Sequence, residues 1–191
     1  MHQRRATVVD DRRTTVDSLR TRLFGSRSGD AVGPKGEQKV GKELGRLPAG
    51  WRVLHRLQVT ETSAGIDHLV IGPPGVITLH TKHHPKGKVK VYERTLYVDG
   101  ATKNYVWTSE RDARHAATAL TDVCGFTVPT QSAVVFVDVA DVQHKGRPYG
   151  VTITTRQQLV DWLTALPAHM HPRQVEHIWI EARRPEVWLP V

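Results

Sequence analysis

Apolar residues recur along the chain in short runs that predict a strand-rich core between helices. Ile66 to Ile71 and Val76 to Lys82 are mostly apolar, and Pro73-Pro74-Gly75 lies between them, so they predict two strands joined by a turn. Apolar residues return at helical spacing from Gly36 to Leu47 and from Trp107 to Val123. Further strands are expected at Trp51 to Leu57, Lys88 to Tyr92, Thr95 to Val98, Ser132 to Val137 and Val151 to Thr154, and further helices at Gln157 to Leu166 and Pro172 to Arg183.

The order of these elements predicts one α/β domain. A helix precedes strands that read as an antiparallel meander, and a second helix and a buried strand follow, which favours a central mixed sheet flanked by helices. Residues 1–32 are polar and contain a Gly- and Ser-rich segment, so they predict a mobile basic arm. Residues 33–138 form the expected core, and residues 139–191 the C-terminal strand and helices that complete the same domain.

Charged side chains interrupt the apolar hairpin at one end. Because strand side chains alternate, His80 and Lys82 share a face, and we expect Asp67 on that face too, although hairpin register decides it. Glu37 lies three residues before Val40 on the apolar stripe of the first helix, so its carboxylate is expected to face the core and to need a partner. Alternatively, Glu37 complements the helix dipole and bonds a nearby arginine.

Ordered motifs in this region resemble the NERD (nuclease-related) domain, a branch of the PD-(D/E)xK restriction-endonuclease-like superfamily. They are Gly36-Glu37, Ile66-Asp67-His68, Gly72-Pro73 with Gly75-Val76, and Thr81-Lys82. The resemblance spans roughly Gly33 to Ala119 and implies a restriction-endonuclease-like core. It also implies a metal-dependent phosphodiester hydrolase acting on DNA, in which Asp67, His80 and Glu37 surround a divalent cation and Lys82 supports the attacking water.

His80 departs from the family pattern, which has a glutamate or aspartate at this position. Magnesium prefers oxygen ligands, whereas imidazole suits manganese or zinc better. We expect Mg²⁺ or Mn²⁺ if the protein is active; zinc is the weaker expectation, because His80, His83 and His84 lack the cysteine or carboxylate pattern of a zinc site. The histidine is equally compatible with a role as general base, or with a degenerate module that binds nucleic acid or a protein partner without cleavage.

Positive charge is concentrated in two places. Residues 1–56 contain 13 Lys and Arg against 6 Asp and Glu, which accounts for +7 of the net charge of +8. Beside the candidate site, Lys86, Lys88, Lys90 and Arg94 are opposed only by Glu93. Such a patch would bind a polyanion, with DNA the expected partner, by releasing counterions. An exposed strand face would produce the same alternation of lysines without a ligand.

Composition favours an intracellular protein. The single cysteine, Cys124, excludes an intramolecular disulfide and is typical of a reducing compartment. No run of about 18 apolar residues occurs, and the arginine-rich N-terminus lacks an apolar signal-peptide core, so we expect no membrane association and a cytoplasmic location. A homodimer stays an open alternative, since nucleases that cut both strands often pair.

Overall fold

The structure is a computed structural model that describes residues 34–58 and 65–188. Its helices are α2 (Pro34–Leu44), α3 (Tyr105–Cys124), α4 (Leu159–Ala165) and α5 (Pro172–Ala182). Its strands are β1 (Arg52–Leu57), β2 (Ile66–Gly72), β3 (Gly75–His83), β4 (Lys88–Val91), β5 (Leu96–Val98), β6 (Ala101–Lys103), β7 (Thr130–Val137), β8 (Asp141–His144) and β9 (Val151–Thr155). The expected basic arm, residues 1–32, lies outside the described residues.

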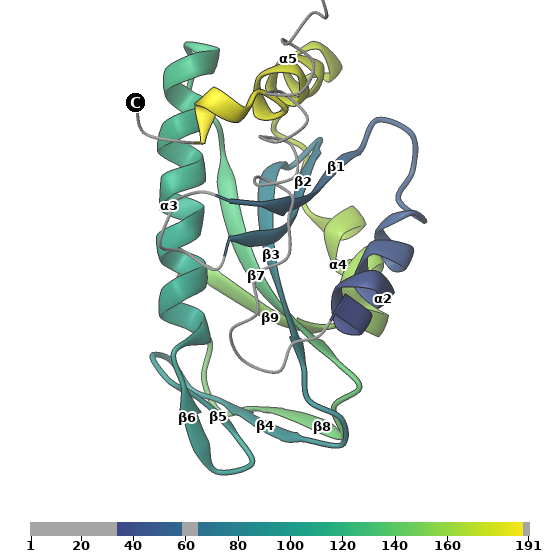
Figure 1. Ribbon diagram of the computed structural model, residues 1–191, viewed down its shortest axis with the longest axis vertical. Helices are drawn as coiled ribbons and strands as arrows, with labels where there is room; N and C mark the ends of the chain where they lie inside the picture. Colours follow the sequence, from purple (N-terminus) through teal and green to yellow (C-terminus); the bar gives the residue numbers. More distant parts are fainter. Residues whose placement is uncertain (1–33, 59–64, 189–191) are drawn as a thin grey trace, which may run out of the picture.

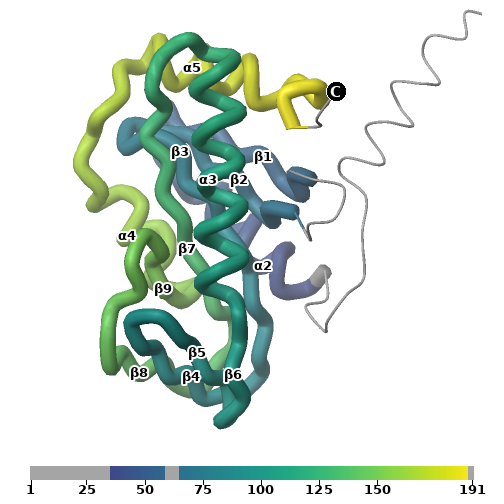
Figure 2. The backbone as a smooth tube through the Cα atoms, turned by 90° about the vertical axis from the view of Figure 1, so that its left-hand side faces the viewer, coloured from purple at the N-terminus to yellow at the C-terminus, as the bar shows by residue number. Residues whose placement is uncertain are grey.

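A five-stranded mixed sheet lies between two helical layers (Figure 1). Its strand order is β1-β2-β3-β7-β9, with β1, β2 and β3 antiparallel and β7 and β9 parallel to β3. The helix α3 runs along one face, as Figure 2 shows, whereas α2 and α4 cover the other. This α/β arrangement is the restriction-endonuclease-like architecture that the element order predicts.

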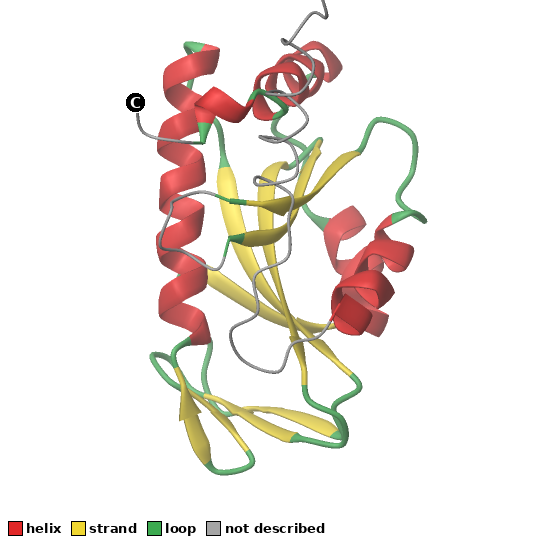
Figure 3. Cartoon of the chain, viewed as in Figure 1, coloured by secondary structure: helices red, strands yellow, loops and turns green. Residues whose placement is uncertain are grey.

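A second sheet of short strands lies at one end of the first (Figure 3). Its order is β6-β5-β4-β8, and β4 pairs with β8 in parallel. The expectation of one continuous meander was therefore wrong for β4 and β5. The chain turns after β3 through Lys86, whose φ is +60°, and the later strand β8 then pairs with β4. Strands β6 and β8 were not predicted, because they are short and largely exposed and so lack an apolar pattern.

Alternating side chains of β3 separate the two main apolar clusters. Val76 packs toward α3 and α5 together with Leu120, whereas Leu79 packs toward α2 and α4 together with Val40 and Leu163. All five of these side chains are buried. The sheet is therefore covered on both faces, and a polar side chain on either face must find a partner inside the protein.

The C-terminal segment contributes to both sheets, because β8 pairs with β4 and β9 with β7. The helix expected from Gln157 begins instead at Leu159, after a 3₁₀ turn over Arg156–Gln158. The hydroxyl of Thr155 donates to the side chain of Gln158 and does not cap the helix. None of the helices in the described part of the chain is both long and apolar enough to cross a membrane.

Candidate functional site

The Asp67 carboxylate lies where the pairing between β2 and β3 ends. Regular pairing runs from Gly72 with Gly75 to His68 with Leu79 and does not include Asp67. The Asp67 side chain instead accepts a hydrogen bond from the backbone N–H of Thr81, with 2.5 Å between Oδ2 and N. Burial raises the pKa of Asp67 to about 6, although the nearby Lys82 charge and this hydrogen bond oppose the rise.

Lys82 follows two positions after His80 on the same face of β3. Its ammonium lies 4.7 Å from the centre of the Tyr105 ring, at the start of α3, in a cation–π contact. The Lys82 charge also lowers the pKa of Asp67, His80 and Asp112. The ammonium of Lys82 is therefore electrostatically coupled to all three of these groups.

His80 and Asp112 are buried against each other, between β3 and α3. The Nε2 atom of His80 lies 3.7 Å from Oδ2 of Asp112, and the side chains are only 7% and 4% exposed. That distance is too long for a hydrogen bond, and Nε2 has no partner among the described residues. Burial, followed by the Lys82 and Arg111 charges, lowers the pKa of His80 to about 3, so its imidazole is neutral.

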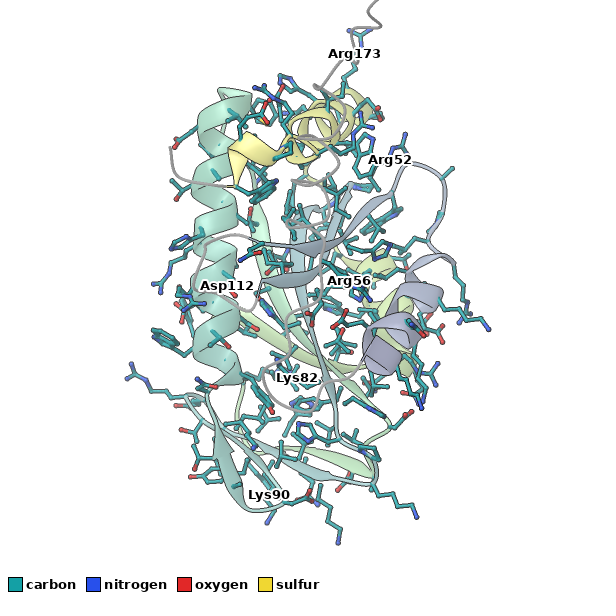
Figure 4. All side chains as sticks on the ribbon, viewed as in Figure 1. Arg52, Arg56, Lys82, Lys90, Asp112 and Arg173 are labelled. Carbon is teal, nitrogen blue, oxygen red and sulfur yellow. The ribbon has the colours of Figure 1, made fainter. Side chains whose placement is uncertain are left out.

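Asp112 is the residue of this site that the sequence analysis missed. Burial raises its pKa, and Arg111 opposes the rise by donating from Nε and Nη2 to Oδ1, at 2.9 and 2.8 Å. Asp112 lies four residues before Ala116, on the apolar stripe of α3 that packs on the sheet. A carboxylate on the apolar stripe of a helix needs a partner inside the protein, so the sequence position of Asp112 could have marked it as a candidate site residue. In Figure 4, Lys82 lies between α3, which carries Asp112, and α2, beside which Arg56 lies.

Glu37 lies on α2 and approaches the site from the other side of the sheet. The Nε atom of Arg56 donates to the Glu37 carboxylate at 3.2 Å. Glu37 is also close enough to Asp67 for its charge to raise the Asp67 pKa. The carboxylate thus has the arginine partner that the alternative interpretation of its sequence position expected, and it also contributes negative charge to the site.

The predicted ligands do not form a ready-made metal centre. Within residues 34–58 and 65–188, no three His, Cys, Asp or Glu side chains are close enough to hold an ion together. Asp67, His80 and Glu37 as a ligand set therefore stay a prediction. His83 lies on the opposite face of β3 and contacts Asp138 at 2.7 Å. His84 contacts Tyr105 at 3.1 Å, so the three nearby histidines do not converge.

The predicted basic patch extends from the end of β3 onto the second sheet. Lys88 and Lys90 are exposed on β4 and alternate with the buried residues Val89 and Val91. Figure 4 shows Lys90 on this smaller sheet, at the end of the molecule beyond Lys82. The two remaining members, Lys86 before β4 and Arg94 after it, are also exposed.

The fold and the motif residues together define a nuclease-related α/β protein. A model of the nuclease-related domain, NERD, matches residues 32–137, which is more than half of the 191 residues. The chain belongs to the NERD family. The match includes the positions of Glu37, Asp67, His80 and Lys82.

One solved structure similar to this chain is SfsA of Pyrococcus furiosus in complex with Ca²⁺. The two are 15% identical and superpose with a TM-score of 0.25, over 80% of this chain. The chain spans about half of that protein, 51% of its length. No curated protein matches the chain.

Proposed function

We propose that this protein is a metal-dependent phosphodiester hydrolase that acts on DNA. The observation that carries the proposal is the Asp67 carboxylate at the open end of the β2–β3 pairing, electrostatically coupled to the ammonium of Lys82. Phosphodiester hydrolysis develops negative charge on the phosphoryl oxygens, and it needs an anionic ligand for a cation beside a donor to that charge. Both kinds of group are present in a family whose name denotes a relation to nucleases.

Lys82 has the properties of the group that stabilises developing charge. Tyr105 lies under its ammonium, which restricts where the long side chain can point. The ammonium would donate to the attacking water or to a phosphoryl oxygen, and the partly water-excluded surroundings would strengthen that interaction. Asp67 holds its carboxylate in place through the Thr81 N–H, so this part of the site is organised before a substrate binds.

Two groups near the end of β3 would serve as ligands for a divalent cation. Asp67 supplies a carboxylate. The Nε2 atom of the neutral His80 has no hydrogen-bond partner among the described residues, so its lone pair is available to a metal ion. A bound cation would acidify a water and polarise the phosphoryl group. Mg²⁺ or Mn²⁺ is the proposed class, with Glu37 as a further ligand if it leaves Arg56. Zinc is less favoured on this donor set.

The exposed lysines of β4 would bind the DNA backbone. Strand β4 follows β3 directly in the chain. A DNA strand that crosses the lysines of β4 would therefore lead to the end of β3, where Lys82 lies. Contacts between ammonium groups and phosphates release counterions and make binding strongly dependent on salt. The patch would raise the local DNA concentration and would carry no sequence information.

The second candidate is a module that binds nucleic acid without cleaving it. The ion pair between Glu37 and Arg56 favours this candidate, because it occupies a carboxylate that a metal centre would need. The imidazole at position 80, in place of an acid, also reduces the negative charge available for a cation. Binding through the basic patch would require none of these groups.

Cleavage of plasmid and single-stranded DNA, scanned over Mg²⁺, Mn²⁺ and Zn²⁺, tests the proposal. Metal-dependent cleavage is expected from the wild type and from Lys42→Ala, a control at an exposed lysine of α2, and none from a folded Lys82→Ala protein. Equal cleavage by Lys82→Ala would rule out the proposed site. Absence of cleavage with every metal, with salt-sensitive DNA binding intact, would establish the binding module.

A further inference from the structure

We propose that Asp112 is a metal ligand that works together with His80, so that a carboxylate from α3 replaces the acid missing from β3. This inference rests on the proposed function and specifies its cation site. The cation would be Mn²⁺, held by the imidazole of His80 on β3 and the carboxylate of Asp112 on α3. Water and a substrate phosphate would complete its coordination, as they do at many sites for hard divalent ions.

Two polar side-chain atoms at this place face each other without a hydrogen bond between them. The buried Nε2 atom of His80 has no hydrogen-bond partner among the described residues. Both hydrogen bonds from Arg111 to Asp112 go to Oδ1 and not to Oδ2. His80 and Asp112 are 5% and 3% exposed, and the Nε2 atom of His80 is shut off from bulk water. An unsatisfied buried polar group costs about 1–3 kcal/mol, and such a group in a native structure calls for a physical explanation. One cation between the two atoms would satisfy both.

The distance between Nε2 of His80 and Oδ2 of Asp112 suits two ligands of one ion. Metal–nitrogen and metal–oxygen bonds to such ligands are each about 2.0–2.2 Å long, so two donors on one ion lie at most about 4.2–4.3 Å apart. The observed 3.7 Å between Nε2 and Oδ2 falls inside that limit but outside hydrogen-bonding range. The two residues are thus too far apart to bond each other and close enough to share an ion.

Arg111 holds the Asp112 carboxylate in one orientation. Arg111 makes two hydrogen bonds to Oδ1, which leaves Oδ2 directed at His80. The Arg111 guanidinium in turn lies 5.3 Å from the centre of the Trp107 ring. Groups that bond the free atoms of a metal ligand typically fix its direction and tune its affinity, and Arg111 has that relation to Asp112.

The donor types favour manganese over magnesium. Magnesium binds through oxygen, whereas a site with one imidazole and one carboxylate suits a first-row transition metal. The pair of His80 and Asp112 supplies only two of the ligands, so affinity for the free ion is expected to be modest. It should increase when a phosphate group supplies further oxygen ligands.

Titration of the protein with Mn²⁺, followed by the EPR signal of the free ion, tests this inference. Asp112→Asn is expected to raise the Mn²⁺ dissociation constant at least tenfold, whereas Asp122→Asn, at an exposed aspartate of the same helix, should leave it unchanged. Thermal melting without metal is the control for folding, and the amide oxygen of Asp112→Asn can still accept from Arg111.

The possible results separate the inference from the proposed function. Wild-type Mn²⁺ affinity in a folded Asp112→Asn protein would overturn the role of Asp112, and loss of binding in Asp67→Asn alone would leave a metal-dependent nuclease with a different ligand set. Absence of Mn²⁺ binding by the wild type, with and without a DNA oligonucleotide, would overturn the inference. Cleavage supported by Mg²⁺ would show that the proposed function survives that result.

Discussion

The carboxylate of Asp67 replaces a backbone partner for the N–H of Thr81, where the hydrogen-bonded pairing of β2 and β3 ends. Asp67→Asn can keep this hydrogen bond through its amide oxygen, and it removes a charge that burial disfavours. We therefore expect a free energy of unfolding at pH 7 equal to or above that of the wild type, with cleavage lost. Urea unfolding and the cleavage assay measure the two effects separately.

Asp67→Ala provides the comparison, because it leaves the Thr81 N–H without an acceptor. An unsatisfied backbone donor costs about 1–3 kcal/mol, so this variant should be less stable than Asp67→Asn by that amount. Both variants should be equally inactive. An Asp67→Asn protein that cleaves DNA at the wild-type rate would contradict the ligand role of the carboxylate.

Alternation along single strands explains which part of the site could be predicted. The positions of His80 and Lys82 on one face follow from the two-residue period of β3. The register of β2 and β3 ends at His68, so the expectation that Asp67 shares this face stays a prediction. The contact of Asp112 with His80 depends on how α3 packs on β3, two segments some 30 residues apart in the chain. The separate sheet of β4 to β6 likewise depends on pairing with β8, which has no apolar pattern of its own.

The position of His80 predicts what a carboxylate would do there. In His80→Glu, the new carboxylate would lie close to Asp112 in a buried place, and like charges at that distance repel. We expect the metal-free variant to melt several degrees below the wild type, and Mg²⁺ to raise its melting temperature more than it raises that of the wild type. Differential scanning calorimetry with and without Mg²⁺ measures both changes.

A matched variant on the same strand controls for the added charge. His83→Glu would place a carboxylate near Asp138, on the opposite face of β3 and away from Asp112. This variant should also lose stability, but Mg²⁺ should not restore it. A similar Mg²⁺ response in both variants would mean that the effect is general screening of charge and not binding beside Asp112.

The exposed lysines of β4 predict the salt dependence of DNA binding. Each phosphate contact contributes about 0.9 to the slope of log affinity against log salt on double-stranded DNA, so Lys88→Gln with Lys90→Gln should reduce the slope by about 1.8. The control is Lys35→Gln with Lys42→Gln, at two exposed lysines of α2. Fluorescence anisotropy at several salt concentrations measures the slopes. Equal slopes for the two double variants would mean that DNA does not cross β4.

His68 predicts how the stability of the protein changes in acid. Its Nδ1 atom lies 2.7 Å from Nδ1 of His55, on the side of the sheet that α2 covers, and burial followed by the His55 charge lowers its pKa to about 3. The unfolded chain binds a proton near pH 6.5 and the folded chain does not, so the stabilisation is complete above pH 6.5 and is lost as the pH falls toward 3. Between pH 7.5 and 4.5 this one group should remove about 2–3 kcal/mol of stability.

Comparison with His68→Leu isolates that contribution. Urea unfolding at pH 7.5, 6 and 4.5 should show a wild-type stability that falls faster than that of the variant, because the leucine cannot bind a proton in the unfolded chain. His144→Leu, at an exposed histidine of β8, controls for the loss of a histidine as such. If the wild type and His68→Leu lose stability in parallel, His68 takes up a proton in the folded protein, and the buried contact with His55 must open to water at low pH.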